Sequence, residues 1–583
     1  MVLKFLFELE SFQGIFERIA LRIGRERGVK VGLVRNRQLL EIYLEGELEE
    51  LEGFGKQLGE ELPFSLFLRG SKVELGEEFK NSLPRVFPQL NLPPCPRCLK
   101  EVLTPDSPYY FNPFHSCEIC GYSGVGEGWS SQLMPERGEF PELFRRLGEG
   151  LMERGELLIQ TMNGKFKIKK GITGEGVVVG RGVGEVGSYF ILEEGEQKGL
   201  ASIEKPILLL KPTLKFRREF RSSAEVVPVK LPDDLVLELL FRSLPEGVSL
   251  LELEPTGETP DLEFKVAPPQ PIPVAIGTDS RRLDPLLQQG ERGILPALFP
   301  VNWEGGKKVG VAGPYRARYR EIGGVKLVEV KRGGGVIEGG VEARPRFGGI
   351  FGVIEGWGIS EKRLLCYSLW RGEGGLYLYS PATGLSPILE PKFRFTSFQE
   401  IFQQIRQINE TGERLISNFR ERLPELYHRA LKGEVAGEGG LYYLWGVIGV
   451  LLGFGERWEK GANTLLSKVE GFIGKKGVRI DYRPSSTGGI DPLWVIRTSI
   501  SYLLAGSDPV QIGYGVVESG AEYLSNLYLS LEKELELNGA VLVGNLLTGT
   551  FLRKLYSYLE RNFPVYTPFG LPVTGWEATA VGG

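Results

Sequence analysis

The first part of the chain changes between strand-like and helix-like spacing of its apolar residues. Leu3, Phe5, Phe7 and Leu9 occupy every second position, as on the buried face of a strand. Apolar residues then recur every three or four positions, as on the buried face of a helix. The elements that follow are strands at 31–34 and 39–44, a helix at 48–58 and strands at 64–68 and 71–75. This order predicts a ferredoxin-like α+β sandwich.

The remainder of the chain alternates shorter helices and strands, which predicts α/β domains. Helical spacing is clearest at 144–154, 515–535 and 551–559, and strand spacing at 156–161, 206–210 and 540–544. A chain of 583 residues is too long for one hydrophobic core, so we expect three or four domains. The longest apolar run, at 441–454, is interrupted by glycines and is too short to cross a membrane.

Charge and the N-terminal pattern argue against several classes of function. The net charge is −4, from 70 Lys and Arg against 74 Asp and Glu, so no broad basic surface is available for nucleic acid. The first ten residues alternate in polarity and carry charges too early for a signal peptide. We therefore expect a cytoplasmic protein that binds neither a membrane nor nucleic acid.

Four of the five cysteines form two C-x-x-C knuckles, Cys95 with Cys98 and Cys117 with Cys120. Each knuckle aims two thiolates at one point, and two knuckles supply the four sulfur ligands that a structural zinc ion prefers. Such a site has no open coordination position, so we expect the metal to fold the module rather than to catalyse. Two alternatives stay open, namely two disulfides or an iron ion in the same cage.

The residues around the knuckles resemble the first zinc finger of HypF proteins. They read Pro94-Cys-Pro-Arg-Cys-Leu-Lys-Glu101 and Asn112-Pro-Phe-His-Ser-Cys-Glu-Ile-Cys-Gly121. HypF proteins are the carbamoyltransferases of nickel–iron hydrogenase maturation. The resemblance implies a place in that route, in which carbamoyl phosphate and ATP give a carbamoyl group that passes to the partner HypE for the cyanide ligand.

The resemblance also implies a multidomain α/β and α+β architecture. Its parts are a ferredoxin-like acylphosphatase domain at 1–85, a zinc-finger module at 86–135, a YrdC-like α/β domain at 136–266 and a sugar-kinase-like (ASKHA) carbamoyltransferase-like domain at 267–583. HypF carries a second finger. This sequence has no cysteine between Cys120 and Cys366, so that finger is absent here.

In the acylphosphatase-like domain, the resemblance assigns phosphate binding to Arg18 and the orientation of water to Asn36. The family's second loop glycine is Phe16 here, and the phenylalanine before its arginine is Glu17. A carboxylate beside a phosphate site repels the substrate, and the loss of a glycine restricts the backbone that must wrap it. The alternative is that Arg18 is a surface helix arginine paired with nearby acids.

In the YrdC-like domain, the resemblance places ATP binding and carbamoyl-adenylate formation on a stretch that the family writes K-x-R-x-x-K-P. Here this stretch reads Leu200-Ala-Ser-Ile-Glu-Lys-Pro206, so only Lys205 and the proline remain of the family's cations and motif. Phosphate contacts depend on charge, and these losses are not conservative. We expect that adenylation is lost, and a solvated lysine at the end of a strand is an equal alternative for Lys205.

In the last domain, the resemblance implies a metal and nucleotide site. The family's V-x-D-G-x-G aspartate is Glu355 here, its S-G-G-V loop keeps one glycine, Gly544, and its C-terminal ligand aspartate is Thr574. The two histidines, His115 and His428, are far apart in the sequence, so the family's histidine pair on one helix is impossible.

Three hypotheses follow from these departures. The first is a degenerate HypF-like binding or scaffold protein, with a HypE-like maturation protein as its partner and zinc as its structural metal. The second is an active carbamoyltransferase whose site is rebuilt with Glu355, Asp279 or Asp491. The third is that only the N-terminal domain remains active, as an acyl-phosphate hydrolase that uses Arg18 and Asn36. Cys366 is a candidate nucleophile, although a lone buried cysteine is the more common case.

Overall fold

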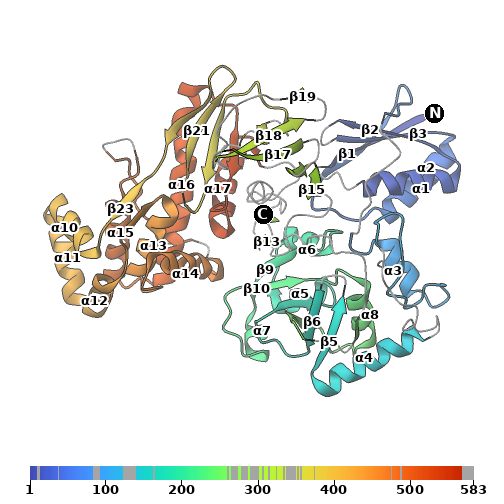
Figure 1. Ribbon diagram of the computed structural model, residues 1–583, viewed down its shortest axis with the longest axis horizontal. Helices are drawn as coiled ribbons and strands as arrows, with labels where there is room; N and C mark the ends of the chain where they lie inside the picture. Colours follow the sequence, from blue (N-terminus) through green and yellow to red (C-terminus); the bar gives the residue numbers. More distant parts are fainter. Residues whose placement is uncertain are drawn as a thin grey trace. The chain divides into compact units, whose positions relative to one another are not determined.

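The computed structural model of the chain separates into two compact units, the first built mainly from 1–277 and the second mainly from 317–568 (Figure 1). The structure describes residues 1–9, 14–36, 39–82, 92–122, 139–161, 164–258, 262–263, 274–276, 287–288, 301–304, 307–312, 315–322, 325–332, 335–336, 350, 353–354, 357–372, 374–474, 476–485 and 489–567.

The N-terminal domain (residues 1–82) is a four-stranded antiparallel sheet with two helices on one face (Figure 1). Its elements are β1 (Val2–Leu9), α1 (Ile15–Arg27), β2 (Lys30–Asn36), β3 (Leu39–Glu45), α2 (Leu48–Glu61) and β4 (Leu68–Leu75). The strand order is β2-β3-β1-β4. The sequence predicted two strands at 64–68 and 71–75, but these residues contribute one strand, because the chain stays extended through Gly70 and pairs there with Glu8.

Helix α1 is held on the sheet by the apolar face that the sequence predicted. Phe16 is fully buried and its ring lies 5.4 Å from that of Phe7 on β1. Glycines in the left-handed region flank the helix, Gly14 with φ 74° before it and Gly28 with φ 70° after it. Glycine adopts this conformation without the Cβ clash that other residues suffer, so both ends of α1 are fixed by the sequence.

The cysteine module (residues 92–122) contains one helix, α3 (Pro96–Leu103), and leads to a central domain (residues 139–288). The elements of the central domain are α4 (Phe140–Arg154), β5 (Glu156–Thr161), β6 (Gly164–Lys169), β7 (Val177–Gly180), α5 (Val183–Tyr189), β8 (Phe190–Ile191), α6 (Glu194–Ala201), β9 (Ile207–Pro212), α7 (Leu214–Glu219), β10 (Val227–Lys230), α8 (Leu235–Ser243), β11 (Leu250–Pro255), β12 (Leu262–Glu263), β13 (Val274–Ile276) and β14 (Leu287–Gln288).

These strands form one sheet in the order β12-β5-β6-β11-β7-β10-β9-β13-β14, and β8 pairs with β9. Strand β13 lies parallel to β9. The resemblance placed these residues in the last domain, at 267–583, whereas in the structure they extend the sheet of the central domain. The division of the chain into four domains stays a prediction.

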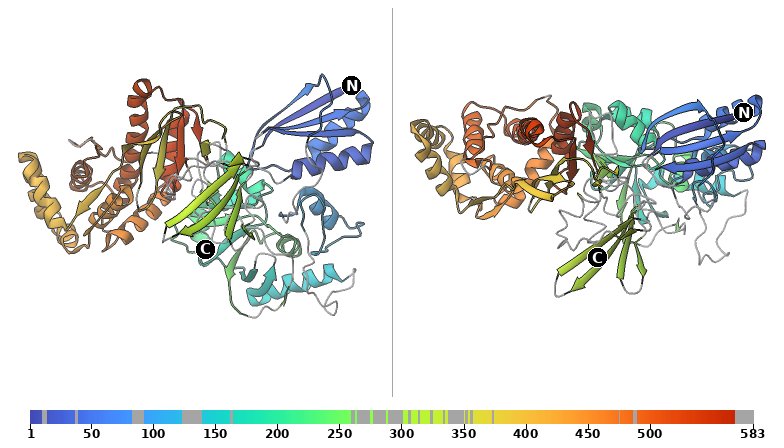
Figure 2. Two further views of the ribbon diagram at one scale, coloured as in Figure 1. Left: turned by 45° about the horizontal axis from the view of Figure 1, so that its top comes forward. Right: turned by 90° about the horizontal axis from the view of Figure 1, so that it is seen from above.

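A separate five-stranded sheet comes next in the sequence and appears in light green in Figure 2. Its strands are β15 (Val301–Glu304), β16 (Lys307–Ala312), β17 (Tyr315–Ile322), β18 (Val325–Arg332) and β19 (Gly335–Val336), paired in that order.

The second unit is organised around a sheet with the order β22-β21-β20-β25-β26, in which β20, β25 and β26 run parallel. Its strands are β20 (Leu364–Leu369), β21 (Gly374–Ser380), β22 (Gly384–Leu389), β25 (Ala540–Val543) and β26 (Val565–Tyr566), and β23 (Phe393–Phe395) pairs with β24 (Gly437–Gly439). The helices are α10 (Phe398–Ile408), α11 (Glu410–Arg422), α12 (Pro424–Lys432), α13 (Leu441–Leu451), α14 (Trp458–Gly471), α15 (Pro492–Leu504), α16 (Pro509–Leu535) and α17 (Gly549–Glu560).

Helices α13 and α14 cross at backbone contact, which explains the glycines in the long apolar run. A Cβ on Gly446 would lie 2.4 Å from the carbonyl oxygen of Trp458, and one on Gly449 would lie 2.3 Å from that of Gly461. Within the described part of the chain, no helix is long and apolar enough to cross a membrane.

Candidate functional site

The four knuckle cysteines converge on one point. The Sγ–Sγ distances are 3.6 Å for Cys95 and Cys98, 3.9 Å for Cys95 and Cys117, and 3.6 Å for Cys98 and Cys120. All four sulfur atoms lie within 4.8 Å of one another. A disulfide has an S–S distance of about 2.05 Å, so the alternative of two disulfides is wrong.

The sulfur cage has the size that a tetrahedral metal ion needs. Zinc–sulfur bonds of about 2.3 Å place tetrahedral sulfur atoms about 3.8 Å apart, which matches the three distances above. Cys95 and Cys98 begin α3, where the helix N-terminus favours thiolates. Cys117 and Cys120 lie in a turn that the N–H of Gly121 closes by donating to the carbonyl of Cys117. The residues therefore fit a structural metal ion, and zinc as its identity stays a prediction.

The cysteine module is also bonded to the central domain. The backbone N–H of Leu235, at the start of α8, donates to the hydroxyl of the buried Tyr122 at 3.2 Å. The ring of Phe111 lies 6.0 Å from that of Phe144 on α4. Because both contacts come from segments that the knuckles hold in place, a metal ion here would position one domain against another.

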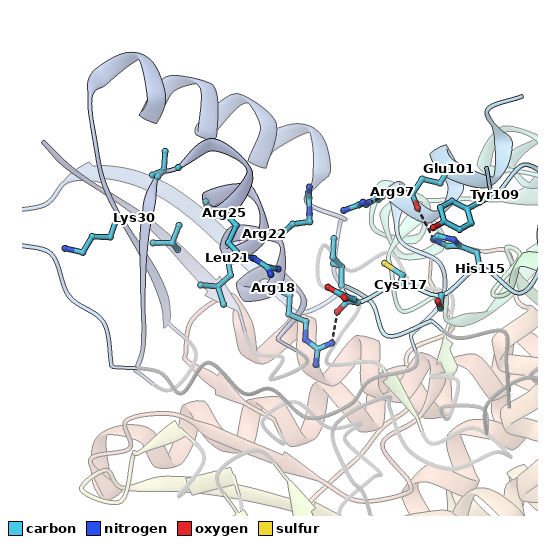
Figure 3. Close-up of a pocket in the computed structure, with 17 residues that line it drawn as sticks. Arg18, Leu21, Arg22, Arg25, Lys30, Arg97, Glu101, Tyr109, His115 and Cys117 are labelled. Atoms are coloured by element: carbon cyan, nitrogen blue, oxygen red, sulfur yellow. Dashed lines mark hydrogen bonds and ion pairs between the residues drawn. The ribbon is translucent and has the colours of Figure 1, made fainter. Parts of the chain in front are cut away.

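On its other side the module faces α1 across a cavity of about 990 Å³ (Figure 3). Arg18, Arg22 and Arg25 line one wall, at positions that share a face of α1. Arg97 and Cys117 lie on the opposite wall. The guanidinium of Arg18 donates to the carbonyl of Glu118 at 3.1 Å, and burial lowers its pKa. Arg18 thus contacts the metal module.

Of the two residues that the resemblance assigns to acyl-phosphate chemistry, Arg18 and Asn36, the structure describes the side chain of Arg18 only. Asn36 ends β2, but its side chain and the loop at 10–13 lie outside the described residues. Glu17 is buried in the first turn of α1 and forms an ion pair of 3.4 Å with the buried Arg35, which also donates to the carbonyl of Leu9. Burial raises the pKa of Glu17, and Arg35 opposes that shift. A carboxylate therefore occupies the region beside Arg18.

The segment that the resemblance assigns to the triphosphate lies at the contact between the N-terminal and central domains. Glu204 is 1% exposed, and its carboxylate accepts from the hydroxyl of Ser65 at 2.6 Å and from the N–H of Leu66 at 3.0 Å. Burial raises its pKa. Lys205 follows with φ 44°, and burial lowers its pKa.

In the second unit, Gly544 has a packing role. It follows β25 with φ 129°, and a Cβ there would lie 2.0 Å from the carbonyl oxygen of Leu369. Asp491 caps α15 by accepting from the N–H of Leu493 at 3.0 Å. The other candidates for this unit, Glu355, Asp279 and Thr574, lie outside the described residues.

The remaining candidates, Cys366, His428 and His115, lie in different parts of the chain and form no common site. Cys366 is fully buried on β20, and burial raises the pKa of its thiol, so it is an inert core residue rather than a nucleophile. His428 is exposed on α12, and its Nδ1 lies 2.7 Å from the carbonyl oxygen of Pro424. His115 lies in the cysteine module, 3.0 Å from Glu101.

The sequence also gave no sign of a carboxylate that fills a set of backbone N–H groups in the central domain. Glu252 on β11 accepts from the N–H and hydroxyl of Thr173 and from the N–H of Gly174, each at 2.7 Å, and from the N–H of Gly176 at 3.1 Å. Burial alone would raise the pKa of Glu252, but these bonds hold it below its usual value. Thr173, Gly174 and Gly176 form what we call the Glu252 cradle.

Solved structures define the class of protein to which this fold corresponds. HypF from T. kodakarensis aligns with a TM-score of 0.62 at 12% identity, covering 100% of this chain and 97% of that one. A full-length HypF solved in a phosphate- and nucleotide-bound form aligns with a TM-score of 0.58 at 14% identity, with the same coverage. The chain therefore has a HypF-like fold over its whole length, as its sequence predicted.

A curated protein is similar over nearly the same span. Protein HydE of Wolinella succinogenes is 26% identical over 564 residues, which cover 90% of this chain and 91% of that protein. No family model matches the chain.

Proposed function

We propose that this protein is a cytoplasmic, HypF-like component of nickel–iron hydrogenase maturation that binds maturation partners without forming or transferring carbamoyl groups. The observation that carries the proposal is the burial of Glu204 within the stretch Leu200–Pro206. In HypF this stretch supplies cations to a triphosphate. Here its Glu204 carboxylate is buried in hydrogen bonds to the N-terminal domain. A polyphosphate at this position would be repelled by the carboxylate of Glu204, and it would have to break the contact of Glu204 with the N-terminal domain.

Two further carboxylates, Glu17 and Glu252, support the proposal that the chain does not bind anionic substrates. Glu17 lies beside Arg18, where an acyl phosphate would need cations. Glu252 already uses the N–H groups of its cradle, which are of the kind that bind phosphate in other proteins. Each carboxylate repels a phosphoryl group at close range, so the N-terminal and central domains are poorly suited to phosphate chemistry.

Partner binding is the function that this architecture retains. The cysteine module contacts both neighbouring domains of the first unit, through Arg18 and through Tyr122. A metal held by four sulfur ligands would keep those domains in a fixed arrangement that a partner can recognise. We propose a HypE-like maturation protein as that partner.

Calorimetry and metal analysis of the purified full-length chain test the proposal. We expect one zinc per chain and no binding heat with ATP up to about 1 mM, the upper end of ordinary enzyme affinities. The HypE-like protein of the same organism, purified separately, is expected to bind the chain in the absence of ATP and carbamoyl phosphate. Release of pyrophosphate that needs both ATP and carbamoyl phosphate would instead establish the active carbamoyltransferase. Hydrolysis of a simple acyl phosphate, abolished by Arg18→Ala, would establish the hydrolase.

A further inference from the structure

A carboxylate from one helix covers the start of another in the second unit. Glu470 lies near the end of α14, its side chain is 15% exposed, and its Oε1 accepts from the backbone N–H of Thr550. Thr550 is the second residue of the twelve-residue helix α17. Thr548, which precedes this helix, makes no side-chain capping bond of its own. The capping acceptor of α17 therefore comes from elsewhere in the chain.

The surroundings of this carboxylate are shaped to it. Gly549 has φ 53°, and a Cβ there would lie 1.8 Å from the Oε1 of Glu470, so any larger residue would displace the carboxylate. On the other side, Nη2 of Arg553 lies 3.3 Å from Oε2 of Glu470 and also donates to the hydroxyl of Thr550. Arg553 is itself 8% exposed. A helix N-terminus and a buried guanidinium thus face the same anion.

We propose that Glu470 is a resident anion, which permanently fills a small-oxyanion site at the N-terminus of α17 and so closes it to phosphate. Helix N-termini and arginines are the groups with which proteins hold phosphate and carboxylate ions. This inference extends the proposed function. It rests on that proposal in one respect, namely that the second unit binds no phosphate from solution. An ordinary capping contact would stabilise α17 too, but its removal would leave no site that a free anion could fill.

Anion rescue of the full-length chain separates the two cases. Glu470→Ala removes the carboxylate and leaves the N–H of Thr550 and the guanidinium of Arg553. We expect a lower Tm for the second unit, and a rise of about 3 °C when about 50 mM phosphate or formate replaces chloride at equal ionic strength. The wild type and Glu470→Gln, in which the site stays filled, are expected to shift by less than about 1 °C.

A matched control removes a different carboxylate, Glu518 on α16, which also contacts α17. Glu518 lies 3.0 Å from Lys554 on α17 and is similarly buried, but it faces no helix N-terminus. Glu518→Ala is expected to lose stability without anion rescue. Equal rescue of both alanine variants, or none for Glu470→Ala, would overturn the proposal.

Hydrogen exchange in the wild type keeps the test open if Glu470→Ala does not fold. If Glu470 fills the site, added phosphate should not change the hydrogen-exchange rates of the first backbone amides of α17. Slower exchange of these amides in phosphate would mean that the site accepts an external anion, and would overturn the proposal. ATP binding by the wild type would refute the proposed function, yet it would leave the comparison of the alanine variants intact.

Discussion

The Glu252 cradle allows a sharp prediction, because four donors converge on one carboxylate. In Glu252→Gln the shape is kept, but one oxygen becomes an NH₂ group that cannot accept. Two of the four donors then lose their acceptor, and a buried donor without a partner costs about 1–3 kcal/mol. Since the hydroxyl of Thr173 can rotate toward another acceptor, we expect a loss of about 3 kcal/mol from the free energy of opening the cradle.

Native-state hydrogen exchange is the suitable assay, because a chain with several domains does not unfold in one step. A loss of about 3 kcal/mol corresponds to exchange roughly 100-fold faster in the cradle and along β11. Glu175→Gln serves as the control, since Glu175 lies in the same loop, is 68% exposed and lies 3.9 Å from Lys169. Such surface pairs contribute less than about 1 kcal/mol, so exchange should change little.

The pH dependence of this effect has a defined sign. The pKa of Glu252 is held below its usual value in the folded protein, so its charge stabilises the fold above the unfolded pKa of about 4.3. That contribution is lost as the pH falls through the folded pKa. The difference between wild type and Glu252→Gln should therefore be constant from pH 7 to about pH 5 and shrink below about pH 4. A difference of less than threefold in exchange at pH 7 would refute the assigned role.

Other contacts give predictions that separate measurements check. Cys98→Ser is expected to abolish zinc binding in metal analysis and to speed exchange throughout the cysteine module. Gly544→Ala should lower stability in urea by at least about 2 kcal/mol, since its Cβ would meet the carbonyl of Leu369; unchanged unfolding would contradict this. Glu204→Ala should make proteolysis between the N-terminal and central domains faster, because Ser65 loses its acceptor. Because burial raises the pKa of Glu204, the wild-type contact should weaken as the pH rises above about 4.3.

The sequence predicted the features that depend on local spacing. The two C-x-x-C knuckles predicted the sulfur cluster, because three-residue spacing fixes where each pair of thiolates points. Apolar periodicity predicted α1, and the resemblance at the knuckles predicted the HypF-like fold. The error at β4 was also local, since residues 69–70 were left between two predicted strands although one strand continues through Gly70.

The carboxylate contacts could not be predicted in the same way, because they join segments far apart in the chain. Glu204 is 139 residues from Ser65, Glu252 is 78 residues from Gly174, and Glu470 is 80 residues from Thr550. In sequence, such glutamates resemble the solvated charges of any surface. Their partners are mainly backbone N–H groups, which every residue except proline possesses, so no side-chain motif marks them.

These contacts also explain how a fold related to HypF could remain stable without anionic ligands. A ligand that binds only the folded state stabilises it in proportion to its concentration, and that contribution vanishes when binding is lost. Helix N-termini and cradles of N–H groups would then be left without an acceptor, at about 1–3 kcal/mol for each buried donor. Glu252 and Glu470 satisfy such groups from within the chain at every ligand concentration. A phosphate that entered either position would have to displace a covalently attached competitor. Under the proposed function, a gain of carbamoyl transfer would therefore require replacing these glutamates as well as adding cations.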